Sequence, residues 1–309
     1  MPNSSENQDQ FIKHCLDDFN INLKITNISP SISTIFSQIQ NTDIQYLMWG
    51  INILFQNICK SKQKDLYTYS KIIEKWLTNK SKLDIQSVEG YVYIYDILNT
   101  SIQIIVKRPK KRKFITTGIR EFYIGYININ KLRYYIPTFV YTLGGFWKNY
   151  NETHLPHILY EKINGIKVTE ISCFKDWLII FLQLLLSLEL AQREFRFTHF
   201  DLHTNNVIIK NTKKPINYNI YLDNITYGVQ NTLLVPVIID FGLASIYSNG
   251  RSIGKTTLTQ YGIFPYIIPG YDMYKFLCYS TKNLKYLQKD LILLFDFYKS
   301  PQGTNYPYN

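Results

Sequence analysis

The sequence predicts an α+β fold with an N-terminal helical extension, a strand-rich region and a helix-rich region. Three patterns indicate it. Apolar residues recur at helical spacing within 1–80, apolar runs of strand length dominate 81–163, and a long apolar helix lies near the start of 164–309. Of the 309 residues, 46% are hydrophobic, so the chain can build two domains with sizeable cores. We therefore divide the sequence at these boundaries.

The first region, 1–80, is predicted to hold two helices. Apolar side chains between 44 and 58 follow the i, i+3, i+4, i+7 spacing of one helix face, after a capping box at Thr42 and Gln45. The second helix spans 66–77. No residue here indicates chemistry, so we interpret the region as an extension packed on the rest of the chain, with partner binding as the alternative.

The second region, 81–163, is predicted to form a sheet. Its short apolar runs, typical of strands, are Val92–Tyr95, Ile102–Lys107, Thr138–Leu143 and His157–Ile163. A dense basic cluster follows the second run and consists of Lys107, Arg108, Lys110, Lys111, Arg112, Lys113 and Arg120. We interpret most of this cluster as a solvated face; the alternative is a docking site for an acidic substrate, nucleic acid or anionic lipid.

The third region, 164–309, opens with a helix from about Lys175 to Gln192. Its most hydrophobic stretch is interrupted by polar residues and falls short of the roughly 20 apolar residues that a membrane span needs, so a buried helix is favoured. Two short buried strands are predicted further on, at Val207–Ile209 and Val235–Ile239. The polar segment between them, 211–231, is interpreted as a surface insertion.

Two short motifs border these strands and carry the chemistry. His199, Asp201, Leu202 and Asn206 form the pattern H-x-D-L-x-x-x-N, and residues 240–242 read D-F-G. Phosphoryl transfer needs a carboxylate that orients the attacking hydroxyl and oxygen groups that hold magnesium against the phosphates. A catalytic Asp201 with Asn206 and Asp240 as metal ligands would supply these groups.

In this order and spacing, the motifs resemble those of eukaryotic-like Ser/Thr protein kinases. Together with the composition, they are most similar to the kinases of large DNA viruses, and the resemblance covers about 85–280. It implies a bilobal protein-kinase-like fold, in which 81–163 form a small β-rich lobe. The larger helical lobe would be 164–309, with a shortened C-terminus, and Asp272 would brace the catalytic loop from behind.

The resemblance also implies a nucleotide site in the small lobe. Lys107 ends a strand that resembles V-A-I-K and would hold the ATP phosphates, and Glu121 is the local acidic candidate to position it. Gly90 and Val92 resemble the end of a glycine-rich loop whose first two glycines are replaced by Ile85 and Ser87. Backbone groups near Glu161 and Ile163 would contact the adenine.

One departure from the kinase pattern concerns regulation. Phe200 stands where kinases carry an arginine before the catalytic aspartate, and that arginine pairs with a phosphorylated activation segment. We therefore predict that phosphorylation within 243–268, which takes the place of this segment, does not activate the protein.

The function predicted from these residues is that of an ATP-dependent Ser/Thr protein kinase that uses magnesium or manganese. One alternative is a small-molecule kinase of the aminoglycoside or choline phosphotransferase type, because these share the D-L-H form with His203. The other is a pseudokinase scaffold, against which the joint presence of Lys107, Asp201, Asn206 and Asp240 argues.

Charge and cysteines bear on partners and location. The net charge of +11 favours an acidic protein substrate besides ATP, whereas nucleic acid is not favoured because no base-reading motif is present. The four cysteines are scattered, as free thiols of a reducing compartment are: Cys15, Cys59, Cys173 and Cys278. With a polar N-terminus and no membrane span, we expect a cytoplasmic protein, in the host cytoplasm or in the virion if it is viral.

Overall fold

The computed structural model describes residues 77–83, 89–97, 102–133, 135–150, 153–248, 251–254 and 270–298. The chain forms two compact units, one of Met1–Thr78 with Asp96–Ile102 and the other of Asn79–Tyr95 with Gln103–Asn309. Almost all described residues belong to the second unit. The helices predicted at 44–58 and 66–77 lie outside the described residues, apart from Leu77. That residue begins a strand instead of ending a helix, because this segment is hydrogen-bonded into a sheet.

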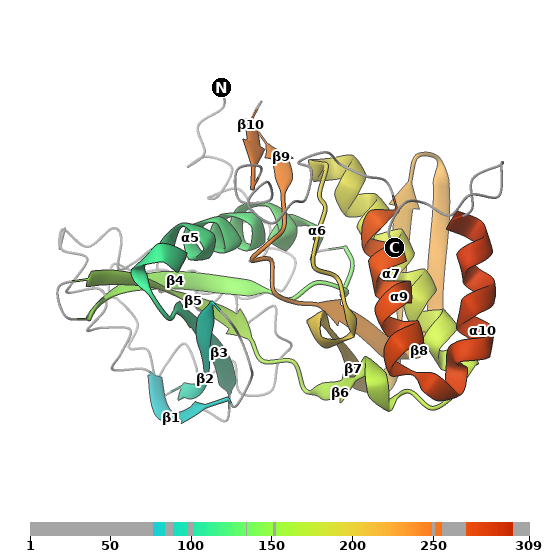
Figure 1. The fold of residues 1–309 in the computed structure, drawn as a ribbon, viewed down its shortest axis with the longest axis horizontal. Helices are drawn as coiled ribbons and strands as arrows, with labels where there is room; N and C mark the ends of the chain where they lie inside the picture. Colours follow the sequence, from blue (N-terminus) through green and yellow to red (C-terminus); the bar gives the residue numbers. More distant parts are fainter. Residues whose placement is uncertain are drawn as a thin grey trace, which may run out of the picture. The chain divides into compact units, whose positions relative to one another are not determined.

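A five-stranded sheet forms the N-terminal part of the described structure (Figure 1). Its order is β1-β2-β3-β5-β4, with β1 Leu77–Lys82, β2 Gly90–Ile97, β3 Gln103–Pro109, β5 Thr153–Glu161 and β4 Thr142–Tyr150. Strand β3 runs antiparallel to β5 and places Lys107 opposite Ile158. Ile104 and Val106 are buried, so the alternation along β3 fixes which face Lys107 presents.

The strand predicted at Thr138–Leu143 starts later than expected. Strand β4 begins at Thr142, because the residues before it pair elsewhere. The Val140 N–H donates to the Ile238 carbonyl at 3.0 Å, and the Ile238 N–H donates to the Thr138 carbonyl at 2.8 Å. These bonds join the sheet region to the end of β8.

A helix packs on β5 of the sheet. It begins with a 3-10 turn at Arg112–Phe114 and continues as α5 Ile115–Tyr123, a π-helix Ile124–Ile129 and α6 Asn130–Leu132. Glycine disfavours helix, yet Gly125 is needed here because a Cβ at this position would clash with the Thr142 hydroxyl. The glycine thus permits the close approach of the helix to β4.

Helix α7, Phe174–Phe195, is the central buried helix of the remaining structure. The Cys173 sulfur caps its start by accepting the Asp176 N–H at 3.4 Å, and Arg196 ends it in the left-handed conformation. It follows β6 Gly165–Lys167 and a 3-10 turn at Val168–Glu170. Its buried apolar face consists of Trp177, Ile180, Phe181, Leu184, Leu188 and Ala191.

A long hairpin packs on α7 and carries both motifs at its base. Strands β7 Val207–Leu222 and β8 Ile225–Ile238 pair antiparallel, and β6 joins them in the order β6-β7-β8. The predicted surface insertion, 211–231, is therefore not a separate loop but the continuation of the two strands. Its tip is exposed, with Tyr221 at 59% and Ile225 at 57%, whereas the base of the hairpin is buried.

Two helices close the described chain. Helix α9, Tyr271–Asn283, packs against α10, Gln288–Leu293, and 3-10 turns lie at Lys285–Leu287 and Leu294–Tyr298 (Figure 1). A short hairpin precedes them, made of β9 Ile246–Ser248 and β10 Arg251–Ile253. Within the described ranges, every helix is too short or too polar to cross a bilayer.

Candidate active site

Residues 199–206 form a loop between α7 and β7 that is held from behind by α9. The Asp272 carboxylate accepts the backbone N–H of His199 at 2.7 Å and that of Phe200 at 2.8 Å. Asp272 is buried, and burial raises the pKa of its carboxyl above the ordinary value. The bracing role expected of this residue therefore rests on two hydrogen bonds to the backbone of the loop.

The backbone of Phe200 takes a conformation that such a residue rarely adopts. Its φ is 60°, and its ring is fully buried and tilted against Tyr271 at a centroid distance of 5.6 Å. Asp272 binds its N–H, and the Lys275 ammonium donates to its carbonyl at 2.9 Å. Helix α9 thus fixes the left-handed turn at both the N–H and the carbonyl of Phe200.

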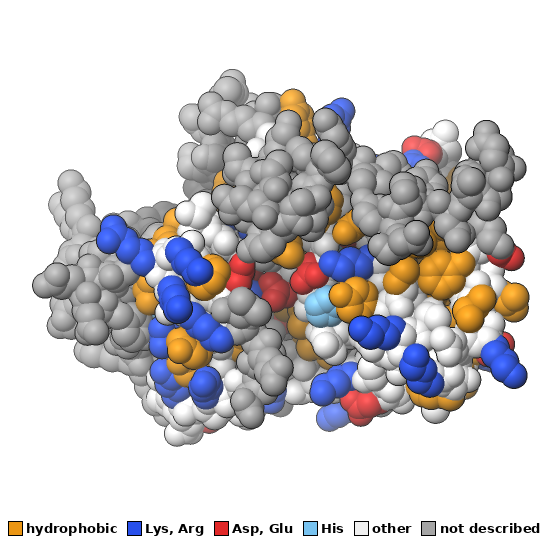
Figure 2. All heavy atoms as spheres, in the orientation of Figure 1, with side chains coloured by type: hydrophobic (Ala, Val, Ile, Leu, Met, Phe, Trp, Pro, Cys, Tyr) orange, Lys and Arg blue, Asp and Glu red, His pale blue; other side chains and the backbone are white. Residues whose placement is uncertain are grey.

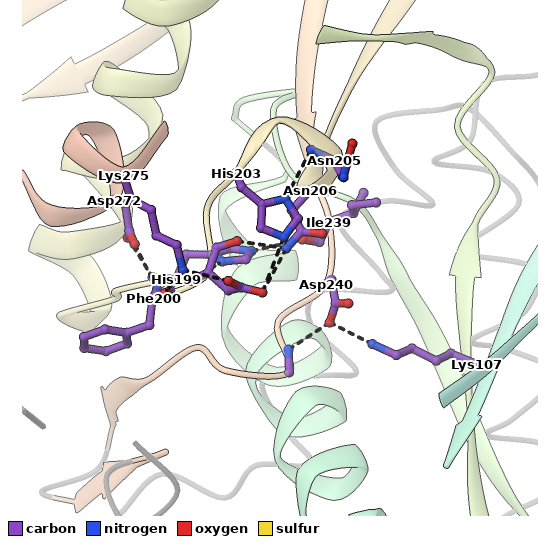
Figure 3. A network of polar contacts seen from close by, with 12 residues as sticks. Lys107, His199, Phe200, His203, Asn205, Asn206, Ile239, Asp240, Asp272 and Lys275 are labelled. Carbon is purple, nitrogen blue, oxygen red and sulfur yellow. Dashed lines mark hydrogen bonds and ion pairs between the residues drawn. The ribbon is translucent and has the colours of Figure 1, made fainter. Parts of the chain in front are cut away.

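Asp201 contacts three residues, His203, Asn206 and Lys275, which are labelled in Figure 3, and we call these four residues the loop cluster. Lys275 donates to one carboxylate oxygen at 2.7 Å, and the His203 Nε2 lies 3.6 Å from the other. Burial alone would raise the pKa of Asp201, but the hydrogen bonds from His203 and Lys275 outweigh it and lower the pKa to about 2. The carboxylate is therefore ionised at neutral pH.

Asp240 belongs to a second group, the lysine cluster: Lys107, Glu121, Tyr160 and Asp240. The Lys107 ammonium donates to Asp240 at 2.7 Å (Figure 3). It also donates to Glu121 at 2.9 Å, so one cation bridges strand β3, helix α5 and the D-F-G turn. Asp240 has a φ of 63°, and its Oδ1 also accepts the Gly242 N–H at 3.2 Å. This turn points the carboxylate at Lys107.

Buried partners fix Glu121 in the lysine cluster. Its Oε1 accepts the Tyr160 hydroxyl at 2.7 Å as well as Lys107, and the side chain is almost fully buried. The preceding residue of α5, Arg120, donates to the carbonyl of Gly242 in the D-F-G turn. Helix α5 is therefore connected to this turn directly through Arg120, and indirectly through Glu121 and Lys107, despite Gly118 in its sequence.

The charges of Lys107 and Asp240 reinforce each other, whereas burial, together with the charge of Asp240, raises the pKa of Glu121 although Lys107 lowers it. Burial alone would lower the pKa of Lys107, but the carboxylates of Asp240 and Glu121 raise it well above its ordinary value. Burial alone would raise the pKa of Asp240, but Lys107 lowers it. The ammonium and the Asp240 carboxylate are therefore both charged at neutral pH.

The backbone connects the two clusters. The Ile239 N–H donates to the Asn206 carbonyl at 3.0 Å, and the Ile239 carbonyl lies 3.0 Å from the His199 Nε2. These bonds place the end of the catalytic loop beside the residue that precedes Asp240. The structure thus brings together Lys107, Glu121, Asp201, Asn206 and Asp240, which were selected from sequence alone.

Two of these residues fit a magnesium ion, which prefers oxygen ligands. The Asn206 amide nitrogen donates to the Asp201 carbonyl at 2.8 Å, which leaves the amide oxygen as the atom for a metal. Asp240 uses Oδ1 for Lys107 and Gly242 and offers Oδ2. Among the described residues, no group of three or more His, Cys, Asp or Glu side chains is arranged to hold a metal.

The residues predicted to bind the nucleotide flank the lysine cluster. Gly90 begins β2, and a Cβ there would lie 3.1 Å from the Arg108 carbonyl and 3.4 Å from Lys107 carbons. Val92 is half-buried on the same strand, while Ile85 and Ser87 lie outside the described residues. The predicted glycine-loop position thus lies directly against the lysine side chain.

The predicted adenine contacts lie at the end of β5. The Glu161 N–H donates to the Tyr141 carbonyl at 3.1 Å, and its buried carboxylate accepts the Tyr141 N–H at 2.8 Å and lies 3.5 Å from Arg133. The side chain therefore fixes the strand. Ile163 follows and packs on the core.

Three contributors to the site were not found in the sequence: Lys275, Tyr160 and Arg120. Each reaches a motif residue across at least 39 positions of sequence, so no local pattern marks it. Lys275 had one available signal, because it lies three residues after Asp272 and therefore on the same face of a helix.

On the surface, acidic side chains gather near the middle of the view, beside a histidine (Figure 2). Lysine and arginine side chains gather over strands β1–β3 and the start of α5. Lys80 lies 3.9 Å from the centre of the Tyr93 ring, and Arg108 lies 4.7 Å from that of Tyr91. Part of the basic cluster therefore covers tyrosine rings of the sheet by cation–π contacts.

The structure holds a lysine bound to two carboxylates and an ionised aspartate in an H-x-D-L-x-x-x-N loop, a combination typical of kinases. The profile of the family described as Haspin like kinase domain matches residues 94–287, more than half of the chain. The chain belongs to this Ser/Thr kinase family. A kinase domain implies ATP as the phosphoryl donor.

Two curated viral proteins are similar to the chain. Probable kinase 098L of Invertebrate iridescent virus 3 is 37% identical over 236 residues, which are 73% of this chain and 44% of the relative. Uncharacterized protein 179R of Invertebrate iridescent virus 6 is 26% identical over 240 residues, which are 69% of this chain and 19% of the relative. The chain spans less than half the length of these relatives, and the similarity to kinases of large DNA viruses is shown.

Proposed function

We propose that this protein is an ATP-dependent Ser/Thr protein kinase that transfers the γ-phosphate of ATP to a protein hydroxyl. The observation that carries the proposal is the meeting of the lysine cluster and the loop cluster across the bonds of Ile239. We also propose a two-lobed fold, with a small lobe at 81–163 and a large lobe at 164–309.

Lys107 would bind the ATP phosphates, and Glu121 would hold its ammonium in place. The hydrogen bonds at 2.9 Å and 2.7 Å support this role, because the charged form of Lys107 is stabilised by both carboxylates. Gly90 and Val92 would cover the phosphates and the base, and the backbone at Glu161 and Ile163 would bind the adenine.

Asp201 would orient the acceptor hydroxyl. With a pKa of about 2 it is a weak base, so it accepts the proton only late, when the hydroxyl oxygen has begun to bond to phosphorus. Asn206 and Asp240 would hold magnesium through their free oxygens. When bound, the ion would neutralise part of the negative charge on the phosphates.

The test is magnesium-dependent transfer of label from γ-labelled ATP to the protein itself, to generic protein acceptors and to aminoglycoside and choline acceptors. Asp201→Asn should abolish transfer and keep ATP binding, whereas Asp290→Asn, an exposed aspartate on α10, should behave as the wild type. Label on small molecules alone would replace the protein-kinase proposal by the small-molecule alternative. Wild-type protein that binds no ATP would overturn both and favour a scaffold.

A further inference from the structure

One face of helix α9 contacts the catalytic loop along its whole length. The residues of this face lie at positions i, i+3, i+7 and i+11, which is the spacing of a single helical stripe. Their contacts with 199–204 are those of Asp272 and Lys275, already described, of the Tyr279 ring 5.4 Å from His203, and of the Asn283 amide donating to the Thr204 hydroxyl at 2.7 Å. Of these four, Lys275 alone carries a positive charge.

Lys275 lies near the start of this face and contacts Asp201. Its ammonium has three N–H donors, and the described part of the chain offers it two acceptors, the Phe200 carbonyl at 2.9 Å and the Asp201 carboxylate at 2.7 Å. The side chain is 20% exposed, so the ammonium is not sealed in the core. A third N–H donor of this ammonium is therefore available to a bound substrate.

The two clusters differ in how their charges are neutralised. Lys107 already lies between two carboxylates, Glu121 and Asp240. On the acceptor side, the transferred phosphoryl group must approach the ionised carboxylate of Asp201, and two anions repel each other strongly in a partly buried site. Lys275 is the cation in hydrogen-bond contact with that carboxylate.

We propose that Lys275 is a catalytic residue that binds the transferred phosphoryl group from the acceptor side. The bond between the γ-phosphorus and the oxygen of ADP breaks while the bond to the acceptor oxygen forms, and the acceptor proton passes to Asp201. Lys275 keeps its three protons and donates one to a phosphoryl oxygen that gains charge in the transition state. This inference rests on the proposed phosphoryl transfer.

The experiment measures single-turnover transfer from γ-labelled ATP to the protein itself, together with its dependence on ATP concentration. Lys275→Gln keeps a hydrogen-bond donor for the loop but removes the charge, and Lys275→Arg keeps the charge. We expect Lys275→Gln to lower the transfer rate about 100-fold with the ATP concentration at half-maximal rate unchanged, and Lys275→Arg to regain about tenfold of that loss. Lys282→Met, at an exposed lysine of the same helix, is the matched control.

A merely structural role for Lys275 gives a different result. Lys275→Gln would then transfer phosphate at the wild-type rate, or both variants would lose activity in parallel with thermal stability and with ATP affinity; either result overturns the inference. Wild-type protein that transfers label to no acceptor would instead refute the proposed function itself, and this inference with it.

Discussion

The lysine cluster and the loop cluster use the same kinds of charge in opposite ways. In the lysine cluster, one ammonium is shared by two carboxylates that come from a helix and a turn. In the loop cluster, one carboxylate is flanked by Lys275 and His203. The first arrangement fixes a cation that can bind phosphate, and the second keeps an anion ionised for the acceptor. In each half of the site, the group with two partners of opposite charge is therefore the one whose charge is fixed: Lys107 in the first and Asp201 in the second.

The largest effect is expected from breaking the lysine cluster. Lys107→Met keeps most of the side-chain volume but leaves Glu121 and Asp240 without their shared cation. We expect kcat/KM for ATP to fall about 100-fold, because the phosphates lose a preorganised donor. Steady-state kinetics measure it, with Lys111→Met, an exposed neighbour, as control. Wild-type kinetics in Lys107→Met would mean that this ammonium does not serve the nucleotide.

The support of the loop cluster is tested by Asp272→Asn. The amide keeps one acceptor oxygen, so one of the two backbone N–H groups of His199 and Phe200 is left buried without a partner. We expect the free energy of unfolding to fall by about 2 kcal/mol. Urea denaturation measures it against Asp290→Asn. An unchanged midpoint would show that α9 does not hold the loop through this carboxylate.

A smaller effect is expected from Glu121→Gln. The amide can still accept from Tyr160 and Lys107, and the ammonium keeps its bond to Asp240. Only the charge of one partner is lost, so we expect kcat/KM to fall about tenfold. A loss as large as that of Lys107→Met would contradict the view that Glu121 and Asp240 both hold the Lys107 ammonium.

The smallest effect concerns pH and the loop cluster. Burial alone would raise the pKa of Asp201, yet hydrogen bonds from His203 and Lys275 lower it from 3.8 to about 2 in the folded protein. The resulting stability is present above the ordinary pKa and is lost as the pH falls through about 2. The difference in unfolding free energy between the wild type and Asp201→Asn should therefore be larger at pH 5 than at pH 3. Equal differences would show that the pKa is not lowered.

The motif residues of the site could be selected from sequence because phosphoryl transfer requires particular side chains at fixed spacing. Asp201, Asn206 and Asp240 are of this kind, and the buried strands beside them follow from short apolar runs. The partners Tyr160 and Lys275 could not be selected in this way, since their contacts arise only when distant elements pack.

The fold likewise contains elements that the sequence predicts and elements that it does not predict. Periodicity predicted helix α7 and the strands at the base of the long hairpin, but it did not predict that 211–231 continue these strands. Part of that segment carries the alternation of a half-buried strand, because Ile220 and Leu222 are buried while Tyr221 between them is exposed. The polar composition of the whole segment outweighed this signal in the sequence, and its strands form by pairing across the hairpin. For Leu77 as well, pairing with a neighbouring strand outweighed the helical spacing.

The ion pair between Lys107 and Asp240 has a consequence for how the nucleotide enters. The carboxylate oxygen nearest to Lys107 is already in use at 2.7 Å, so a metal ion arriving alone would compete with a bound cation for the same anion. A nucleotide that arrives alone would bring its phosphates next to that anion. With the proposed function, Lys107 would pass from the carboxylate to a phosphate, and Asp240 would hold a metal ion in its place. A nucleotide that is already bound to its metal would bring both the anion that Lys107 needs and the cation that Asp240 needs.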